Sequence, residues 1–196
     1  MKTPRFDESY WTDKYLRNET GWDMGLVSPP IREYVDQLDS KELAILIPGA
    51  GNAYEAEYLH DSGFSNVDVL DISQTPLENL LERVPHFPGE RLIQSDFFKW
   101  DKQYDLILEQ TFFCALDPSL RGAYAQKMNE LLKPGGRLAG LLFDFPLTES
   151  GPPFGGSRAE YLDTFEDRFK IKVLEPCHNS IKPRLGRELF IIFEKK

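Results

Sequence analysis

Short apolar runs alternate with amphipathic stretches along the middle of the chain, and this alternation predicts parallel strands joined by helices. We expect strands at residues 42–51, 66–73, 91–96, 104–110 and 137–145. We expect the intervening helices at residues 52–63, 75–84 and 117–136. Right-handed crossovers between such strands would cover both faces of one sheet with helices.

Polar, proline and glycine residues mark the expected ends of these helices. Asn52 is the expected N-cap of the first helix and Gly63 its C-terminal stop. Thr75 is the expected cap of the second helix, with Pro76 at its first helical position. The third helix is expected to stop at the Pro-Gly-Gly sequence of residues 134–136.

The C-terminal part of the chain departs from this rhythm. Residues 157–167 fit a helix, whereas residues 169–176 and 187–196 fit two strands. The linker between the two strands is too short for a crossover helix, so they should pair in antiparallel fashion. We therefore expect an α/β fold with a seven-stranded, mostly parallel sheet, a C-terminal antiparallel hairpin and helices on both faces. That is the layout of class I methyltransferases, which use S-adenosylmethionine.

Length and composition narrow the class of protein. A chain of 196 residues is expected to form a single domain over residues 1–196. Its net charge of −9 disfavours nucleic acid as a partner. Cys114 and Cys177 lie in unrelated contexts, so no metal site is expected and a reducing compartment is favoured. Without a membrane-length apolar run, we expect a cytoplasmic protein that does not bind membranes, with a monomer as the default.

The residues at the ends of the first two strands predict a nucleoside-binding site. In an open parallel sheet, ligands bind at the carboxyl ends of the strands. Gly49 and Gly51 would let the backbone approach a ligand just before a helix N-terminus. Asp71 ends the second strand, where a carboxylate can accept hydrogen bonds from both ribose hydroxyls. A tight strand–helix turn without a ligand is the alternative reading of the glycines.

The start of the first helix bears on which nucleoside cofactor is bound. A dinucleotide site has a third glycine where this chain has Tyr54, and Glu55 and Glu57 would repel a diphosphate. Both acids are compatible with the cationic S-adenosylmethionine, although acids also favour helix N-termini for their own sake. An NAD-linked oxidoreductase is therefore the disfavoured alternative.

The next two strands end in further candidates for ligand contact. Asp96 could accept a hydrogen bond from an adenine amino group, and Phe97 could pack on the adenine ring. A turn cap and a core side chain are the alternative roles of these two residues. Glu109, Gln110 and Phe113 are expected at the ligand edge of the fourth strand. Glu109 resembles acids that hold the methionine end of the cofactor, and a position facing water is its alternative.

Several segments between Phe6 and the end of the chain form a specific combination. They read WTDKYLRNETGWDMG, SPPI, IPGAGNAYEAEYL, DIS, SDFF, FFCALDPSLRGAY, LLKPGG and GPPF. Together they resemble the thiopurine S-methyltransferase family, and more closely its branch of thiol, thiocyanate and halide methyltransferases than the thiopurine enzyme itself. The resemblance implies that the glycine turn, Asp71, Asp96 and Phe97 contact S-adenosylmethionine.

The same resemblance gives a role to the N-terminal segment. Residues 1–40 would form a helical lid, and Trp11, Tyr15 and Trp22 match aromatic positions that close over the cofactor. Packing in the core is the alternative role of these aromatic residues. Asp23 would tie the turn of this lid together. We call residues 1–40 the lid segment.

The resemblance also indicates an acceptor pocket around Gln110, Phe113 and Phe154. Gln110 stands where the plant halide and thiol branch has tyrosine and the thiopurine enzyme has a substrate-contacting arginine. Because glutamine carries no positive charge, an anionic thiopurine is disfavoured. Phe154 lies in a loop, residues 151–156, which is either a second lid or a rigid surface loop.

The implied reaction is direct transfer of the sulfonium methyl group to a small sulfur or halide nucleophile, and no catalytic acid or base is expected. None of His60, His86 and His178 falls at the end of a predicted strand. The enzyme would act by aligning the reactants and excluding water. A thiopurine, a selenium, tellurium or arsenic anion, a small amine, and a non-catalytic S-adenosylmethionine-binding module are the remaining alternatives.

Overall fold

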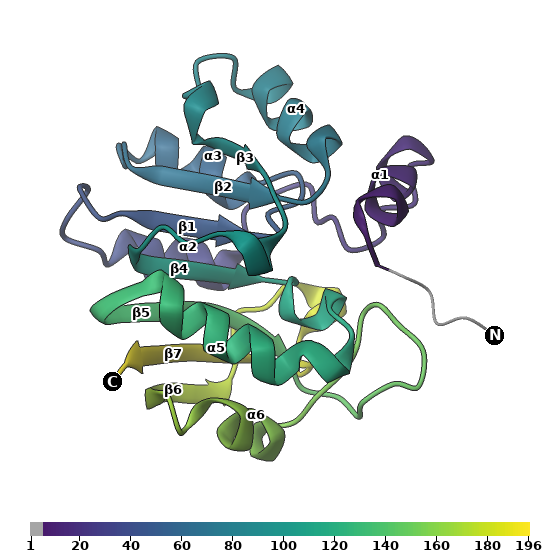
Figure 1. Cartoon of the computed structure of the whole chain (residues 1–196), viewed down its shortest axis with the longest axis vertical. Helices are drawn as coiled ribbons and strands as arrows, with labels where there is room; N and C mark the ends of the chain where they lie inside the picture. The colour runs from purple at the N-terminus through teal and green to yellow at the C-terminus, as the bar shows by residue number, and fades with distance from the viewer. Residues whose placement is uncertain (1–5) are drawn as a thin grey trace.

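A seven-stranded sheet forms the centre of the computed structural model, which describes residues 6–196 (Figure 1). The strand order is β3-β2-β1-β4-β5-β7-β6. The strands are β1 (Ile45–Pro48), β2 (Val67–Asp71), β3 (Leu92–Gln94), β4 (Tyr104–Gln110), β5 (Leu132–Phe143), β6 (Phe169–Pro176) and β7 (Glu188–Lys195). The first five strands are parallel, and β7 runs antiparallel to both β5 and β6. The expected fold class is confirmed.

Helices cover both faces of the sheet. They are α1 (Glu8–Leu16), α2 (Pro29–Asp36), α3 (Tyr54–Asp61), α4 (Gln74–Arg83), α5 (Arg121–Leu131) and α6 (Arg158–Phe165). Figure 1 shows α2 and α3 behind the sheet, α5 and α6 in front of it, and α1 beyond the carboxyl ends of β1 and β2. The lid segment therefore contains two helices, α1 and α2, and its first five residues lie outside the described part of the chain.

The central strand β1 is apolar throughout because both of its faces are buried. Side chains alternate across a strand, so Leu46 of β1 packs in the cluster beside α5 and α6. Its neighbours Ile45 and Ile47 pack in the other cluster, with residues of α2, α3 and α4. The same division places Ile107 of β4 on the α5 face and Leu106 on the opposite face.

The first crossover helix begins differently from the expectation. Its N-cap position is Ala53, in the left-handed conformation with φ 55°, and not Asn52. Asn52 instead donates a side-chain hydrogen bond to Asp23 of the lid segment. Gly63 follows the end of the helix with φ 87°, as expected of a stop.

The second crossover helix, α4, begins at Gln74 after Ser73. Thr75 and Pro76 therefore lie inside its first turn, two positions further along the helix than expected. Proline is tolerated there because the first backbone N–H groups of a helix have no partner within it.

The third expected helix is shorter than predicted at both ends. Residues 118–120 form a separate 3-10 turn, and α5 covers only Arg121–Leu131. Strand β5 then begins at Leu132, ahead of the expected start, because this buried residue pairs with Tyr104 of β4. The pairing register shifts before Arg137, so the Pro-Gly-Gly sequence is accommodated inside the strand and does not cap the helix.

Three structural findings concern the cysteines, membrane-spanning helices and metal-binding groups. Cys114 and Cys177 are both free and buried. Within residues 6–196 no helix is long and apolar enough to cross a membrane. The same residues contain no group of three His, Cys, Asp or Glu side chains able to hold a metal ion.

The contact between β4 and β5 requires glycine at position 140. A Cβ atom on Gly140 would lie 2.0 Å from the Glu109 carbonyl oxygen. We expect Gly140→Ala to lower the free energy of unfolding, measured by urea denaturation, by about 1–3 kcal/mol. Gly122 on α5 has open space around its Cα, so Gly122→Ala should be neutral or stabilise by up to about 1 kcal/mol. Equal effects of the two substitutions would contradict this account.

Candidate active site

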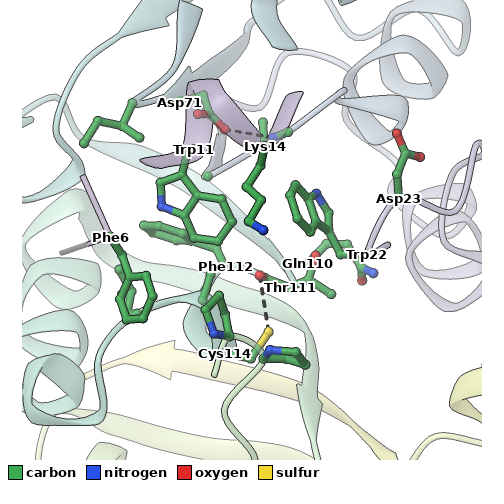
Figure 2. Close-up of a pocket in the computed structure, with 18 of the residues that line it drawn as sticks. Phe6, Trp11, Lys14, Trp22, Asp23, Asp71, Gln110, Thr111, Phe112 and Cys114 are labelled. Atoms are coloured by element: carbon green, nitrogen blue, oxygen red, sulfur yellow. Dashed lines mark hydrogen bonds between the residues drawn. The ribbon is translucent and has the colours of Figure 1, made fainter. Parts of the chain in front are cut away.

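A cavity of about 940 Å³ lies at the carboxyl ends of the parallel strands, between them and the lid segment. This is the edge of the sheet where the fold class binds ligands. Among the sequence-predicted site residues, those that line it are Trp11, Tyr15, Trp22, Gly49, Gly51, Asp71, Asp96, Phe97 and Gln110. Figure 2 shows Trp11, Lys14 and Trp22 of the lid segment together with Gln110 and Phe112 from the end of β4.

The backbone conformation of the turn after β1 requires glycine at two positions. Gly49 and Gly51 have φ values of 56° and 54°, which L-residues rarely adopt. A Cβ atom on Gly49 would lie 2.1 Å from the ring of Phe112, and one on Gly51 would lie 3.1 Å from the hydroxyl of Tyr15. The glycines therefore let the turn, the lid segment and the end of β4 converge on one cavity.

Asp71 at the end of β2 is buried between two turns. Its Oδ2 accepts from the backbone N–H of Gly51 and its Oδ1 from that of Ser73, both at 2.9 Å. Burial raises the pKa of Asp71 to about 6, and these backbone hydrogen bonds oppose that rise. A carboxylate has about four acceptor positions, and three backbone groups approach this one, so Asp71 can still accept a hydroxyl donor from a ribose.

Asp96 and Phe97, after β3, have the structural roles named as alternatives, and both also line the cavity where the adenine contacts are predicted. Asp96 caps a 3-10 turn by accepting from the N–H of Phe98 at 3.0 Å, and it also lines the cavity. Phe97 is buried against Phe112, with ring centroids 5.1 Å apart, and it too reaches the cavity wall.

The aromatic residues of the lid segment form one packed group over the cavity. Trp22 makes edge-to-face contacts with Trp11 and Tyr15, at centroid distances of 5.4 and 5.8 Å. Burial raises the pKa of the Tyr15 hydroxyl well above its ordinary value, so this group is a neutral donor at physiological pH. These rings can exclude water from a ligand beneath them and attract a sulfonium cation.

Polar contacts fasten this lid segment to the sheet. Thr12 and Ser73 share a hydrogen bond of 2.8 Å between their hydroxyls. Asp23 accepts from the N–H of Gly25 at 2.7 Å and from the side chain of Asn52. The tie between Asp23 and its own turn is as expected, and its contact with the glycine turn is additional.

Gln110 reaches the cavity from the last position of β4. Its Oε1 is buried and has no hydrogen-bond partner among residues 6–196. Thr111 follows with φ 58°, an uncommon conformation for a non-glycine residue, and turns the chain toward Phe112. An unpaired buried acceptor is costly in a folded protein, so Gln110 is a candidate for a ligand contact.

Three expected site residues do not line the cavity. Glu109 is buried beneath it, where Oε1 accepts from the N–H groups of Phe112 and Phe113 and Oε2 from the hydroxyl of Tyr124. Phe113 is buried in the core because the Thr111 conformation directs Phe112, and not Phe113, to the cavity. Phe154 is buried below its loop, and the neighbouring Pro152 and Pro153 supply that loop's contacts with the cavity.

Burial also raises the pKa of Glu109, to about 7. Its Tyr124 and backbone donors oppose the rise. Its hydrogen bonds hold the turn that presents Gln110 and Phe112, and Glu109 itself does not line the cavity.

The sequence-based prediction missed Phe112, Lys14 and Arg184, which also line the cavity. Phe112 lies one residue from the predicted Phe113, and only the backbone conformation of Thr111 separates the two. Lys14 follows one helical turn after Trp11, which could have indicated it. Arg184 lies in the linker between β6 and β7, where no motif pointed to it.

The two glutamates of α3 have structural partners. Glu55 is buried and accepts from the N–H of Ser28 at 3.0 Å. Glu57 forms an ion pair with Arg83 at 3.0 Å. Both glutamates connect the helix to its neighbours. Their presence is therefore explained without a cofactor, and they give little evidence against a diphosphate.

The described residues fit an adenosyl cofactor. The glycine turn leaves space that a Cβ would fill, Asp71 retains an acceptor position for a ribose, and Gln110 presents an unpaired acceptor. None of His60, His86 and His178 lines the cavity; His60 and His86 pack against each other with ring centroids 5.0 Å apart.

Solved structures with this architecture define the class. The N1-methyltransferase of 1,6-didemethyltoxoflavin from Burkholderia thailandensis, solved with S-adenosylhomocysteine, matches with a TM-score of 0.77. The match covers 96% of this chain and 87% of that one, at 19% identity. The fold is that of class I S-adenosylmethionine-dependent methyltransferases.

Sequence comparisons define the family. The family model described as thiopurine S-methyltransferase matches residues 6–194. A probable thiol methyltransferase 2 from Arabidopsis thaliana is 35% identical, over 77% of this chain and 69% of the relative. Thiocyanate methyltransferase 1 from Brassica oleracea is 31% identical, over 93% of this chain and 83% of the relative. The chain therefore belongs to the thiopurine S-methyltransferase family and is an S-adenosylmethionine-dependent methyltransferase, not an NAD-linked oxidoreductase.

Asp71 gives the first test of the cofactor site. Replacing its carboxylate in Asp71→Asn should weaken S-adenosylhomocysteine binding about 10- to 150-fold by calorimetry, because hydrogen bonds to charged groups contribute about 1.5–3 kcal/mol. In the wild type, protonation of Asp71 should weaken binding as the pH falls below about 6. That pH dependence should be lost in Asp71→Asn. Unchanged affinity in the variant would remove Asp71 from the site, and the exposed Asp61→Asn is the matched control.

A substitution of Trp22 tests whether the lid segment contacts the cofactor. Trp22→Ala should weaken the binding of S-adenosylmethionine, and of its ammonium analogue sinefungin, by about 0.5–2 kcal/mol through the lost cation–π contact. The ammonium or sulfonium ligand should lose more affinity than neutral S-adenosylhomocysteine. Trp100→Phe, which removes the hydrogen bond to Tyr104 away from the cavity, should change only stability. A fall in melting temperature without loss of affinity in Trp22→Ala would show that Trp22 acts only in packing.

Proposed function

We propose that the protein transfers the methyl group of S-adenosylmethionine to a small sulfur or halide nucleophile, such as a thiol, hydrosulfide, thiocyanate or halide. The observation that carries this proposal is the absence of histidine from the cavity among the described residues. Asp71 accepts two backbone N–H groups and would hold the ribose, Asp96 caps its own turn, and Glu109 does not line the cavity. An acceptor that is already anionic needs no histidine base to deprotonate it. The thiol and thiocyanate methyltransferases among the relatives support this class.

The charge balance of such a reaction suits a closed aromatic cavity. When bound, the cofactor supplies an electrophilic methyl group on a cationic sulfur; the bond to that sulfur breaks as the bond to the acceptor forms. An anionic acceptor and a sulfonium give two neutral products, so charge disappears during the reaction. A site that excludes water removes the hydration that would stabilise the separated charges.

In this proposal the chain's residues bind and orient the reactants. The residues that would hold the cofactor are Trp11, Tyr15, Trp22, Gly49, Gly51, Asp71, Asp96, Phe97 and Gln110. Gln110 and Phe112 would form the acceptor side of the cavity, because both extend from the turn after β4. Correct alignment of two bound reactants can lower the barrier by several kcal/mol, about 7–11 in the best cases.

A larger sulfur acceptor, such as a thiopurine or another aromatic thiol, is the second candidate. Its support is the cavity volume of about 940 Å³, near the upper end of the common range for ligand pockets. A metalloid anion would need no such volume.

The acceptor class is tested by a methyl-transfer panel at fixed S-adenosylmethionine. Hydrosulfide, thiocyanate and iodide should be methylated with kcat/KM at least tenfold above a thiopurine, an aromatic thiol, selenite and a small amine. Formation of S-adenosylhomocysteine is the common readout. A preference for the thiopurine would favour the second candidate. Tight cofactor binding without transfer to any acceptor would indicate a non-catalytic binding module.

A further inference from the structure

Arg121 is a buried cation at the first position of α5, and it does not line the cavity. Only 6% of its side chain is exposed. A positive charge at the start of a helix opposes the helix dipole, and a buried charge is costly unless it is paired. Its Nε has no hydrogen-bond partner within residues 6–196, so the two terminal nitrogens have to compensate for its burial.

Three contacts surround the guanidinium of Arg121. Nη1 donates to Oε1 of Glu160 on α6 and forms an ion pair with it. Nη2 donates to the carbonyl oxygen of Gly155 at 2.6 Å. The central carbon of the group lies 4.8 Å from the centroid of the Phe113 ring. One side chain thus connects α5 with α6, with the turn after β4 and with the loop of residues 151–156.

Two backbone hydrogen bonds hold the same loop. The N–H of Gly156 donates to the carbonyl oxygen of Phe145 at 2.8 Å, which closes the loop at its base. The N–H of Phe154 donates to the carbonyl oxygen of Cys114, also at 2.8 Å. Gly155 lies between these two positions, and a Cβ atom on it would lie 2.3 Å from the Phe145 carbonyl oxygen. These contacts favour a rigid loop over a second lid.

The loop forms part of the cavity wall near the proposed acceptor side. Pro152 and Pro153 line the cavity, and so does Cys114, to which the loop is hydrogen-bonded. Cys114 belongs to the turn after β4 that also carries Gln110 and Phe112. Proline has no backbone N–H, so this part of the wall offers a ligand apolar contact and no donor. The position of the loop therefore sets the room left for an acceptor beside the cofactor.

We propose that Arg121 is a positioning residue for the acceptor. Its hydrogen bond to Gly155 fixes the loop, and the loop then holds Pro152 and Pro153 where they exclude acceptors larger than a small nucleophile. This inference rests on the proposed function and deepens it, because it gives a structural reason for the size of the acceptor. Arg121 contacts neither reactant and acts through the loop.

Acceptor selectivity is the readout, because a general loss of structure would not change it. The assay compares kcat/KM for thiocyanate with kcat/KM for thiophenol at saturating S-adenosylmethionine. The intrinsic reactivity of the two acceptors cancels when the ratio of a variant is divided by that of the wild type. A loop released from Arg121 should disfavour the small acceptor, which loses its close contacts, and should admit the larger one.

Arg121→Met keeps an apolar side chain on Phe113 and removes both donors. It should lower the thiocyanate-to-thiophenol ratio by about fivefold or more, mainly through a higher KM for thiocyanate, with less than about a threefold change in S-adenosylhomocysteine affinity. Gly155→Ala should shift the ratio in the same direction, since the added Cβ displaces the loop without removing a donor. Arg158→Met is the matched control, because Arg158 is exposed, donates to the carbonyl of Leu174 and does not line the cavity.

Hydrogen exchange tests the loop without any substitution. In the wild type the amides of Phe154 and Gly156 should be protected by their hydrogen bonds. Protection should fall in Arg121→Met and stay unchanged in Arg158→Met. Rapid exchange of both amides in the wild type would identify a mobile lid and overturn the inference, even if Arg121→Met does not fold.

The outcomes separate this inference from the proposed function. An unchanged ratio in Arg121→Met, or an equal loss for both acceptors, would make Arg121 a purely structural residue and leave the proposed function standing. If the wild type prefers thiophenol to thiocyanate, the proposed function fails. A further shift toward thiophenol in Arg121→Met would then still support the positioning role, and its absence would reject it. If the wild type methylates neither acceptor, both proposals fail.

Discussion

The site depends on one buried carboxylate, that of Asp71. Its two oxygens accept backbone N–H groups from the turn after β1, at Gly51, and from its own following turn, at Ser73. The Ser73 hydroxyl in turn contacts Thr12 of α1, so one side chain at the end of β2 connects the glycine turn with the attachment of the lid. Burial makes the ionised form costly, as its raised pKa shows, and further donors from a ligand would offset that cost.

Glu109 provides a second buried carboxylate at the end of β4, with a different task. It accepts the N–H groups of Phe112 and Phe113, and these hydrogen bonds stabilise the uncommon conformation of Thr111. The cavity wall at Gln110 and Phe112 is therefore supported from below by a charge that does not face the ligand. At the ends of β2 and β4, backbone N–H groups donate to a buried carboxylate and offset the cost of burying it. The turn formed in this way presents neighbouring groups to the cavity.

The sequence allowed the sheet, the glycine turn and the placement of Asp71 to be predicted, because strand periodicity and the order of elements determine where strand ends meet. The aromatic residues of the lid followed from the family resemblance. The exchange of Phe113 for Phe112 could not be predicted, since it depends on a positive φ at Thr111, a residue that rarely adopts it. Arg184 could not be found because its approach to Trp22 joins residues far apart in the chain through a linker without a regular pattern.

The part of the lid segment around α1 is attached to the rest of the molecule by few contacts, whereas α2 packs in the core. Helix α1 has no fully buried residue, and its aromatic side chains pack chiefly on one another and on Trp22. Its polar ties at Thr12 and through Trp22 to Arg184 are individual hydrogen bonds, each contributing about 0.5–1.5 kcal/mol or, to a charged group, about 1.5–3 kcal/mol. Opening would break these few contacts while the buried faces of the sheet stay intact. The geometry thus separates a rigid cofactor platform on the strand ends from a cover that can move without unfolding the core.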